Sequence, residues 1–242
     1  MKLIKADHDR RLELPGVPGP VRRPVDIDRS RTGFANLRSL RIYQFDAHSV
    51  INGHAEEDEV FVIVMAGSVE FSVREANAEG EALSLTLSAV SESSNDACVA
   101  YLSPHSAYQL TPRTDAHVAY ARATPVSSRP SIVFASGVSR DAAGMTVLLK
   151  ETAYAQRLRL RLAQIDARED DISFTPVEEL ESCYEALVHI QTVPAERVAT
   201  VTTGTESTQL HSWDTIAVAP EDRPTLSIAK GSSALVLIVW AG

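Results

Sequence analysis

The sequence has 242 residues but only two cysteines, three methionines and two tryptophans. Cys98 and Cys183 lie far apart in the sequence, and we interpret them as buried free thiols and not as a disulfide. Free thiols are typical of a reducing compartment, and the N-terminus lacks the apolar core of a signal peptide. The expected location is therefore the cytoplasm.

Long apolar runs and an excess of positive charge are also missing. No stretch approaches the roughly 20 consecutive apolar residues that a membrane span needs. The 32 acidic and 23 basic residues give a net charge of −9, which opposes non-specific binding to nucleic acids or membranes. The sequence contains neither a Gly-rich phosphate-binding loop nor a G-x-S-x-G nucleophile motif. We therefore expect no nucleic-acid and no membrane partner, which leaves a small molecule as the expected ligand.

Helical periodicity is scarce, whereas β-type alternation recurs along the chain. Residues 59–66 and 68–73 flank Gly67 and predict a β-hairpin with one buried face. Further short strands are expected from alternating polar and apolar residues bounded by turn signals, at residues 38–45, 82–87, 97–102, 107–110 and 116–122. Many short strands of this kind are typical of an antiparallel sandwich or barrel.

The second half of the chain is a weaker copy of the first. Residues 214–220 resemble residues 97–104, and upstream of them residues 187–193 align best with residues 41–47. In this alignment the second copy is shorter where the long hairpin would fall. The predicted organisation has four parts: an extended Pro-rich arm over residues 1–31, a first barrel over 32–124, a linker over 125–145, and a second, degenerate barrel over 146–242.

The loop before the hairpin is dense in potential metal ligands. His54, Glu56 and Glu59 combine an imidazole with two carboxylates, a set that suits Zn, Mn or Fe, and Gln109 would be a weaker fourth ligand. The competing interpretation is that the four consecutive acids at 56–59 form a solvated loop that blunts a strand end. Under that interpretation no metal is bound, and the sequence assigns no catalytic residue in either case.

A strictly alternating segment in the second half also carries charge. Residues 157–162 read Arg-Leu-Arg-Leu-Arg-Leu, which predicts a strand with a basic face. We expect that face to be a solvated outer face of a sheet, and the alternative is a surface that binds an acidic sugar or a partner.

The ligand-rich loop resembles the first motif of the cupin superfamily, which reads G, five residues, H-x-H, three or four residues, E, six residues, G. His54 matches the first His, Glu56 stands in place of the second, and Glu59 matches the Glu, with seven residues and not six before Gly67. The second cupin motif, P-x-G, two residues, H, falls on the segment from Pro104, where Gln109 replaces the last His. Two of the four metal positions therefore match the superfamily pattern.

The Pro-rich arm, residues 32–34 and residues 102–111 also look similar to two families of bicupins, 5-deoxy-glucuronate isomerase and 5-keto-4-deoxyuronate isomerase. The resemblance implies an all-β fold of two tandem jelly-roll barrels (double-stranded β-helices), the second trimmed, and a homodimer. In those isomerases the metal lies in the C-terminal barrel. Here the repeat alignment places Thr200, Thr202 and Thr225 at the corresponding positions, and threonine is not a usual ligand for such a metal.

Two functions follow from these expectations. The first is a metal-assisted isomerase that acts on a small sugar or sugar acid, with a divalent ion that stabilises the enediolate. The second is a non-catalytic bicupin, with a ligand-binding or structural role and no metal. The sequence leaves both open because loops at the mouth of a barrel set its substrate.

Overall fold

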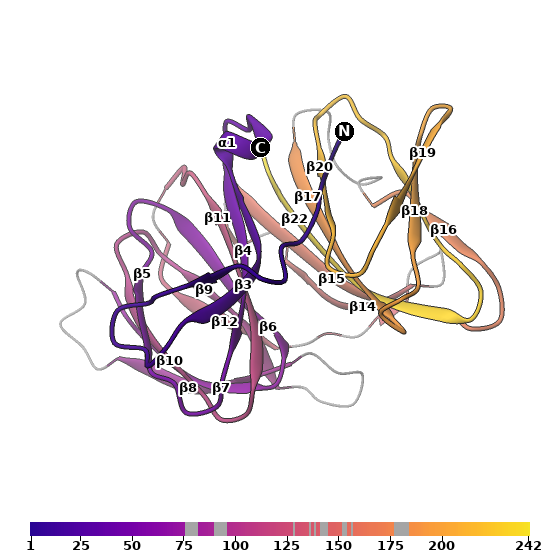
Figure 1. Ribbon diagram of the computed structural model, residues 1–242. Coiled ribbons are helices and arrows are strands. Elements are labelled where there is room, and N and C mark those ends of the chain that lie inside the picture. Colours follow the sequence, from indigo (N-terminus) through magenta and orange to yellow (C-terminus); the bar gives the residue numbers. More distant parts are fainter. Residues whose placement is uncertain are drawn as a thin grey trace.

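The computed structural model describes residues 1–75, 82–89, 96–127, 129–135, 137, 139–140, 145–151, 154–155, 157–176 and 184–242. In this part of the chain the fold is all-β apart from one short helix, α1 (Arg29–Thr32). Figure 1 shows two barrels side by side, each built from a seven-stranded and a four-stranded sheet. The predicted tandem jelly-roll fold is confirmed. No helix in the described ranges is long and apolar enough to cross a membrane.

The first barrel encloses its own apolar core between two antiparallel sheets. Its seven-stranded sheet has the order β12 (Ile132–Ala135), β9 (Ala97–Leu102), β6 (Glu59–Ala66), β11 (Ala116–Ala123), β4 (Leu37–Phe45), β3 (Val21–Asp28), β2 (Arg11–Leu12). Its four-stranded sheet has the order β5 (Ile51–His54), β10 (Ala107–Pro112), β7 (Ser68–Arg74), β8 (Leu83–Ser88). The strands predicted to form a hairpin are β6 and β7, and Gly67 between them has φ 77°, which favours glycine. The hairpin itself is wrong, because the two strands lie in different sheets: β6 pairs with β9 and β11, and β7 pairs with β8 and β10.

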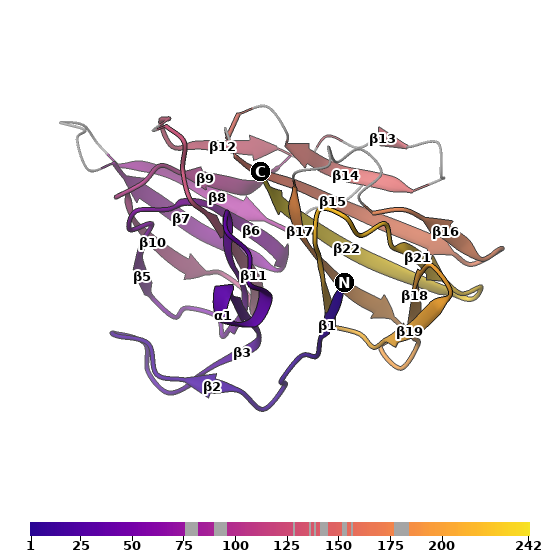
Figure 2. The same cartoon turned by 90° about the horizontal axis from the view of Figure 1, so that it is seen from above.

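The second barrel repeats this plan around a separate core. Its seven-stranded sheet has the order β1 (Lys2–Ile4), β20 (Thr215–Val218), β17 (Glu185–Val193), β22 (Ser232–Ala241), β15 (Leu158–Ala167), β14 (Thr146–Glu151), β13 (Ser139–Arg140). Its four-stranded sheet has the order β16 (Ile172–Phe174), β21 (Thr225–Ile228), β18 (Ala199–Thr203), β19 (Glu206–Leu210). The N-terminal strand β1 therefore belongs to this barrel, whereas β2 and β3 belong to the first (Figure 2).

The matching strand orders correct the repeat alignment predicted from the sequence. By position in the sheets, β17 corresponds to β6 and β15 to β4, so residues 187–193 are not the counterpart of residues 41–47. The counterparts of β6 and β7 in the second copy are β17 and β18, so the segment expected to be missing is present. The strands β18 and β19 have five residues each, against seven in β7 and six in β8, so the second barrel is shortened in its four-stranded sheet. Thr200 and Thr202 lie on β18, the counterpart of β7, and do not correspond to His54 and Glu56.

The two seven-stranded sheets pack against each other through a shared apolar layer. On β6, Val60 and Val62 point into the first barrel, whereas Phe61 and Ile63 belong to the layer between the barrels. Seven of the eight residues of β6 are buried, whereas β7 buries alternate residues. The prediction of one buried face therefore holds for β7 and is wrong for β6, because the second barrel covers its outer face.

The Arg-Leu segment of β15 is buried on its leucine face and partly buried on its arginine face, where Arg157 and Arg159 are half-buried. Leu158, Leu160 and Leu162 join the layer between the barrels, and Arg161 on the opposite face is 9% exposed. The expectation of a solvated basic face is therefore wrong. The arginines point away from the inter-barrel layer because side chains alternate along a strand.

Two buried glutamates form equivalent hydrogen bonds across the contact between the barrels. Glu59, the first residue of β6, accepts a hydrogen bond from the backbone N–H of Leu158 at 2.5 Å. Glu185, the first residue of β17, accepts from the N–H of Leu37 at 2.9 Å and from the two preceding N–H groups. Because β17 corresponds to β6 and β15 to β4, each glutamate binds the first residue of the equivalent strand in the other barrel.

Burial of both faces of β6 predicts that neither face tolerates a charge. Val62→Asp would place an unpaired carboxylate in the first barrel, and Ile63→Asp would place one between the barrels. We expect each to lower the free energy of unfolding by at least about 3 kcal/mol in a denaturant titration. Val126→Asp, at a residue that is 59% exposed, is the control and should change it by less than about 0.5 kcal/mol. Tolerance of aspartate at Ile63 would contradict the packing of the two sheets.

Candidate functional site

Two of the predicted metal ligands lie on the outside of the first barrel. Along β5, Ile51 points into the core, while Asn52 and His54 are exposed on the outer face of the four-stranded sheet. Gln109 on the neighbouring strand is exposed on the same face and donates from Nε2 to Oδ1 of Asn52 at 3.0 Å. His54 and Gln109 therefore do not point into the barrel.

The other two predicted ligands are separated from them by other contacts. Glu59 shares a face of β6 with Phe61 and points toward the second barrel. The hydroxyl of Tyr101, on the neighbouring strand β9, also donates to Glu59 at 3.4 Å. Glu56 is exposed and pairs with Arg122. The extra residue before Gly67, relative to the cupin motif, coincides with an irregularity in β6, where His117 pairs with Ala66 and Val118 with Val64, so that Met65 has no register partner on β11.

The residues present do not fit a divalent metal at the predicted position. His54 and Gln109 share the outer face of the four-stranded sheet, whereas Glu56 pairs with Arg122 and Glu59 points toward the second barrel. Within the described ranges no group of three or more His, Cys, Asp or Glu side chains is arranged to hold a metal ion. We therefore derive no chemical step through a metal.

Aromatic side chains occupy the interior of the first barrel instead. Tyr108 on β10 points inward beside Gly53, and a Cβ added to Gly53 would lie 2.3 Å from the Tyr108 ring. Glycine at this position therefore leaves room for the ring. The Tyr108 ring lies 5.9 Å from those of Phe71 and Tyr120, and Tyr43 contacts Tyr120 edge-to-face at 5.5 Å.

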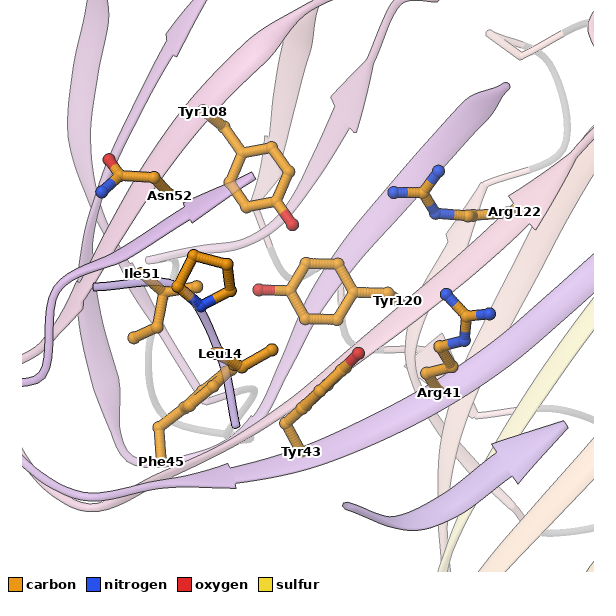
Figure 3. A pocket seen from close by; sticks show the side chains of 10 residues that line it. Leu14, Arg41, Tyr43, Phe45, Ile51, Asn52, Tyr108, Tyr120 and Arg122 are labelled. Carbon is orange, nitrogen blue, oxygen red and sulfur yellow. The ribbon is translucent and has the colours of Figure 1, made fainter. Parts of the chain in front are cut away.

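A cavity of about 90 Å³ lies beside these tyrosines. It is lined by Leu14, Pro15, Arg41, Tyr43, Phe45, Ile51, Asn52, Tyr108, Tyr120 and Arg122. Figure 3 shows the Tyr108 and Tyr120 hydroxyls close to one another, with the guanidinium groups of Arg41 and Arg122 on the other side of the Tyr120 ring from its hydroxyl. No lining residue is acidic, so the cavity has a positive lining.

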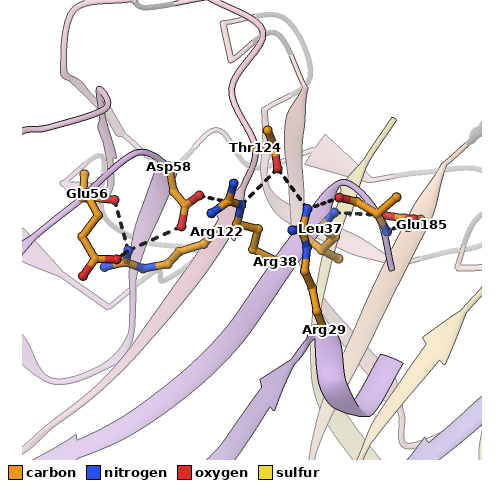
Figure 4. A network of polar contacts seen from close by, with 10 residues as sticks. Arg29, Leu37, Arg38, Glu56, Asp58, Arg122, Thr124 and Glu185 are labelled. Carbon is orange, nitrogen blue, oxygen red and sulfur yellow. Dashed lines mark hydrogen bonds and ion pairs between the residues drawn. The ribbon is translucent and has the colours of Figure 1, made fainter. Parts of the chain in front are cut away.

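Arg122 is fixed at one side of the cavity by the acidic loop that precedes β6. Its Nη2 donates to the carbonyl of His54 at 2.7 Å, and its Nη1 donates to the carbonyl of Ala55 at 3.1 Å. Nη1 also lies 3.4 Å from Oε2 of Glu56 and 3.6 Å from Oδ2 of Asp58 (Figure 4). The acidic loop therefore orients this arginine, a role that the sequence did not indicate.

Asp58 is the buried member of this network. Its Oδ1 lies 2.9 Å from Nε of Arg38, and its side chain is only 7% exposed. Burial raises the pKa of this carboxyl, while Arg38 and Arg122 oppose the rise. The two guanidinium groups hold the loop against the barrel.

Arg41 and Tyr43 are positioned by Asp26 on the adjacent strand β3. Arg41 donates from Nε to Oδ1 of Asp26 at 3.2 Å, and Arg23 bridges Oδ2 of Asp26 and the hydroxyl of Tyr43. The terminal Nη groups of Arg41 have no partner among the described residues. Those groups are therefore available to a ligand in the cavity.

The hydroxyl of Tyr120 is a buried polar group at the cavity that lacks a regular hydrogen bond. The residue is 5% exposed, and among the described residues its hydroxyl meets the Tyr108 hydroxyl, with an angle too poor for a regular hydrogen bond. Burial raises the pKa of Tyr120 well above 10, and burial raises the pKa of Tyr108 to about 12. Both hydroxyls are therefore protonated at neutral pH and able to donate.

The sequence analysis missed these cavity residues. A pattern that points to them is present, because Arg41-x-Tyr43 and Tyr120-x-Arg122 each place an arginine and a tyrosine on one face of a strand. Arg41 and Tyr120 are also register partners between β4 and β11. That the two pairs meet depends on strand pairing, which the alternation alone does not give.

The sequence matches no protein-family model and no curated protein. Among solved structures, an IolB-like protein of Salmonella typhimurium LT2 is similar over 99% of this chain and 92% of its own, with a TM-score of 0.73 and 18% identity. The YlbA protein of E. coli gives 0.66 and 11% over 99% and 90% of the two chains. An oxalate decarboxylase of Lactobacillus farciminis, in a formate complex, gives 0.71 and 8% over 99% and 86%. At these identities the likeness shows the fold, which is the tandem cupin fold.

The geometry predicts that His54 is not required for metal binding. We expect wild type and His54→Ala to bind Mn²⁺ with the same affinity in calorimetric titrations, because His54 and Glu59 lie on different faces. His48→Ala, at another exposed histidine, is the control. A loss of Mn²⁺ binding confined to His54→Ala would restore the predicted ligand set.

The raised pKa of Glu59 predicts that the free energy of unfolding depends on pH. Burial raises the pKa of this carboxyl above its usual value of 4.5, so the folded protein holds the proton more tightly than the unfolded chain. The wild type should therefore gain stability relative to Glu59→Gln as the pH falls toward 4.5, and lose that gain as the pH rises through the folded pKa. Denaturant titrations of both proteins at pH 5 and pH 7.5 measure the difference. A difference that moves the opposite way would contradict a raised pKa.

Proposed function

We propose that this bicupin binds a small organic anion, a short carboxylic acid or the carboxylate of a sugar acid, in the cavity of the first barrel. The observation that carries the proposal is the buried Tyr120 hydroxyl beside the cavity, for which the Tyr108 hydroxyl is the one group in reach and meets it with poor geometry among the described residues. A poorly satisfied buried hydroxyl costs up to about 1–3 kcal/mol, and a bound acceptor would reduce that cost.

The chemistry of the lining supports an anion over a neutral or cationic ligand. Arg41 and Arg122 supply fixed positive charge, while Tyr108 and Tyr120 supply neutral O–H donors. Hydrogen bonds from such donors to a carboxylate are shorter and stronger than bonds between neutral groups. No carboxylate lines the cavity to compete from within it.

The size of the cavity limits the part of the ligand that it encloses. Its volume of about 90 Å³ is smaller than the roughly 150 Å³ of a cavity that holds benzene. A two-carbon acid or the carboxylate end of a sugar acid fits this space. The Lactobacillus farciminis neighbour acts on oxalate and is described with formate, which are acids of this size.

The metal-assisted isomerase predicted from the resemblance has weaker support. It needs a set of convergent metal ligands, and the described residues do not gather one. The proposed function is therefore the non-catalytic alternative, a ligand-binding bicupin.

Replacement of Tyr120 by Phe tests the proposal with two opposite effects. We expect Tyr120→Phe to bind oxalate at least about tenfold more weakly, since a bond to a charged group is worth about 1.5–3 kcal/mol. The same variant without ligand should be more stable by up to about 1 kcal/mol, because a buried hydroxyl that has only a poorly aligned contact with Tyr108 is gone. Isothermal titration calorimetry and denaturant unfolding measure the two quantities.

The titration uses formate, oxalate and glucuronate, with acetamide and glycerol as neutral controls. Tyr184→Phe, in the second barrel, is the control variant and should bind as the wild type does. Binding of the neutral compounds as tightly as the acids would contradict an anion site. Equal binding of oxalate by wild type and Tyr120→Phe would contradict the role of the hydroxyl.

A further inference from the structure

We infer that Glu56 is an internal competitor for the anion on Arg122, so that the acidic loop sets the affinity of the cavity. The inference rests on the proposed function and concerns its regulation. Arg122 lines the cavity on one side and contacts the acidic loop on the other, so one guanidinium group serves both.

The two carboxylates near Arg122 differ in their exposure to solvent and in their number of partners. Asp58 is 7% exposed and is also paired with Arg38 at 2.9 Å, so it is a permanent part of the fold. The Glu56 side chain is 76% exposed and approaches Arg122 at 3.4 Å through one oxygen. Glu56 can therefore exchange this contact for water when another anion reaches the arginine.

The backbone keeps Glu56 beside Arg122. Glu56 has φ 56°, a conformation that is uncommon for a residue other than glycine. Its carbonyl accepts from the N–H of His105 at 2.5 Å, and the N–H of Ala55 donates to the carbonyl of Ser106 at 2.9 Å. The turn at 103–106 thus anchors the acidic loop at the mouth of the barrel, and the carboxylate stays close to the guanidinium group.

The charge of Glu56 opposes an incoming anion in two ways. It occupies part of the donor capacity of Arg122, and as a like charge it repels the ligand. An exposed ion pair contributes at most about 1 kcal/mol, so this competition changes the affinity several-fold and does not abolish binding.

Neutralisation of Glu56 tests the inference. Glu56→Gln should bind oxalate about two- to fivefold more tightly than wild type in calorimetric titrations at low ionic strength. Glu57→Gln is the matched control, because it removes the same charge from the next residue, which is exposed and has no ion pair with Arg122. The gain in Glu56→Gln should shrink when salt screens the competing charge.

Each outcome separates this inference from the proposed function. If wild type and Glu56→Gln bind oxalate equally, the competition is wrong and the anion site stands. An equal gain in Glu57→Gln would also overturn the inference, since the effect would then be one of net charge. If neither wild type nor Glu56→Gln binds oxalate, formate or glucuronate, both proposals are overturned. Circular dichroism checks that the variants are folded.

Discussion

The apolar layer between the two seven-stranded sheets is the contact on which the rest of the structure depends. Each barrel has its own core, yet the central strands of each large sheet carry a second apolar row on the outside. On β11 this row is Ala119, Ala121 and Ala123, whose small side chains allow a close approach of the other barrel. Separated barrels would expose both rows to water, so the two halves are parts of one folded unit.

Glu59 and Glu185 relate this layer to the candidate site. Each places a carboxylate in a region of low dielectric constant, and backbone N–H groups of the other barrel offset the cost. For Glu59 the compensation is incomplete, since burial still raises its pKa. A carboxylate held in this way is unavailable to a ligand inside the barrel. The packing of the two barrels therefore excludes Glu59 from the site that the cupin motif would give it.

The first barrel keeps an interior site of a different chemistry. Where a metal-binding barrel gathers acceptor groups around a cation, this one gathers donors: two guanidinium groups and two protonated phenols. Gly53 makes the change sterically feasible because it leaves the space that the Tyr108 ring fills. The acidic loop, which resembles a ligand motif in the sequence, instead orients Arg122 from outside the cavity.

The sequence by itself determined the strands, the turn at Gly67, the internal repeat and the tandem cupin fold, because alternation and turn residues are local properties of the chain. It did not determine that β6 and β7 belong to different sheets. It did not determine which face of a strand meets which neighbour. The period of two is the same for a row that faces a core, a second barrel or water, so β6, the Arg-Leu segment of β15 and Glu59 were assigned wrongly or incompletely. The cavity residues Arg41, Tyr108 and Tyr120 come from three strands in two sheets. The pairing of β4 with β11 places Arg41 beside Tyr120, and the packing of the two sheets brings Tyr108 to them. Tertiary structure decided the site because burial and partners are set by packing between distant segments, which a local pattern does not encode.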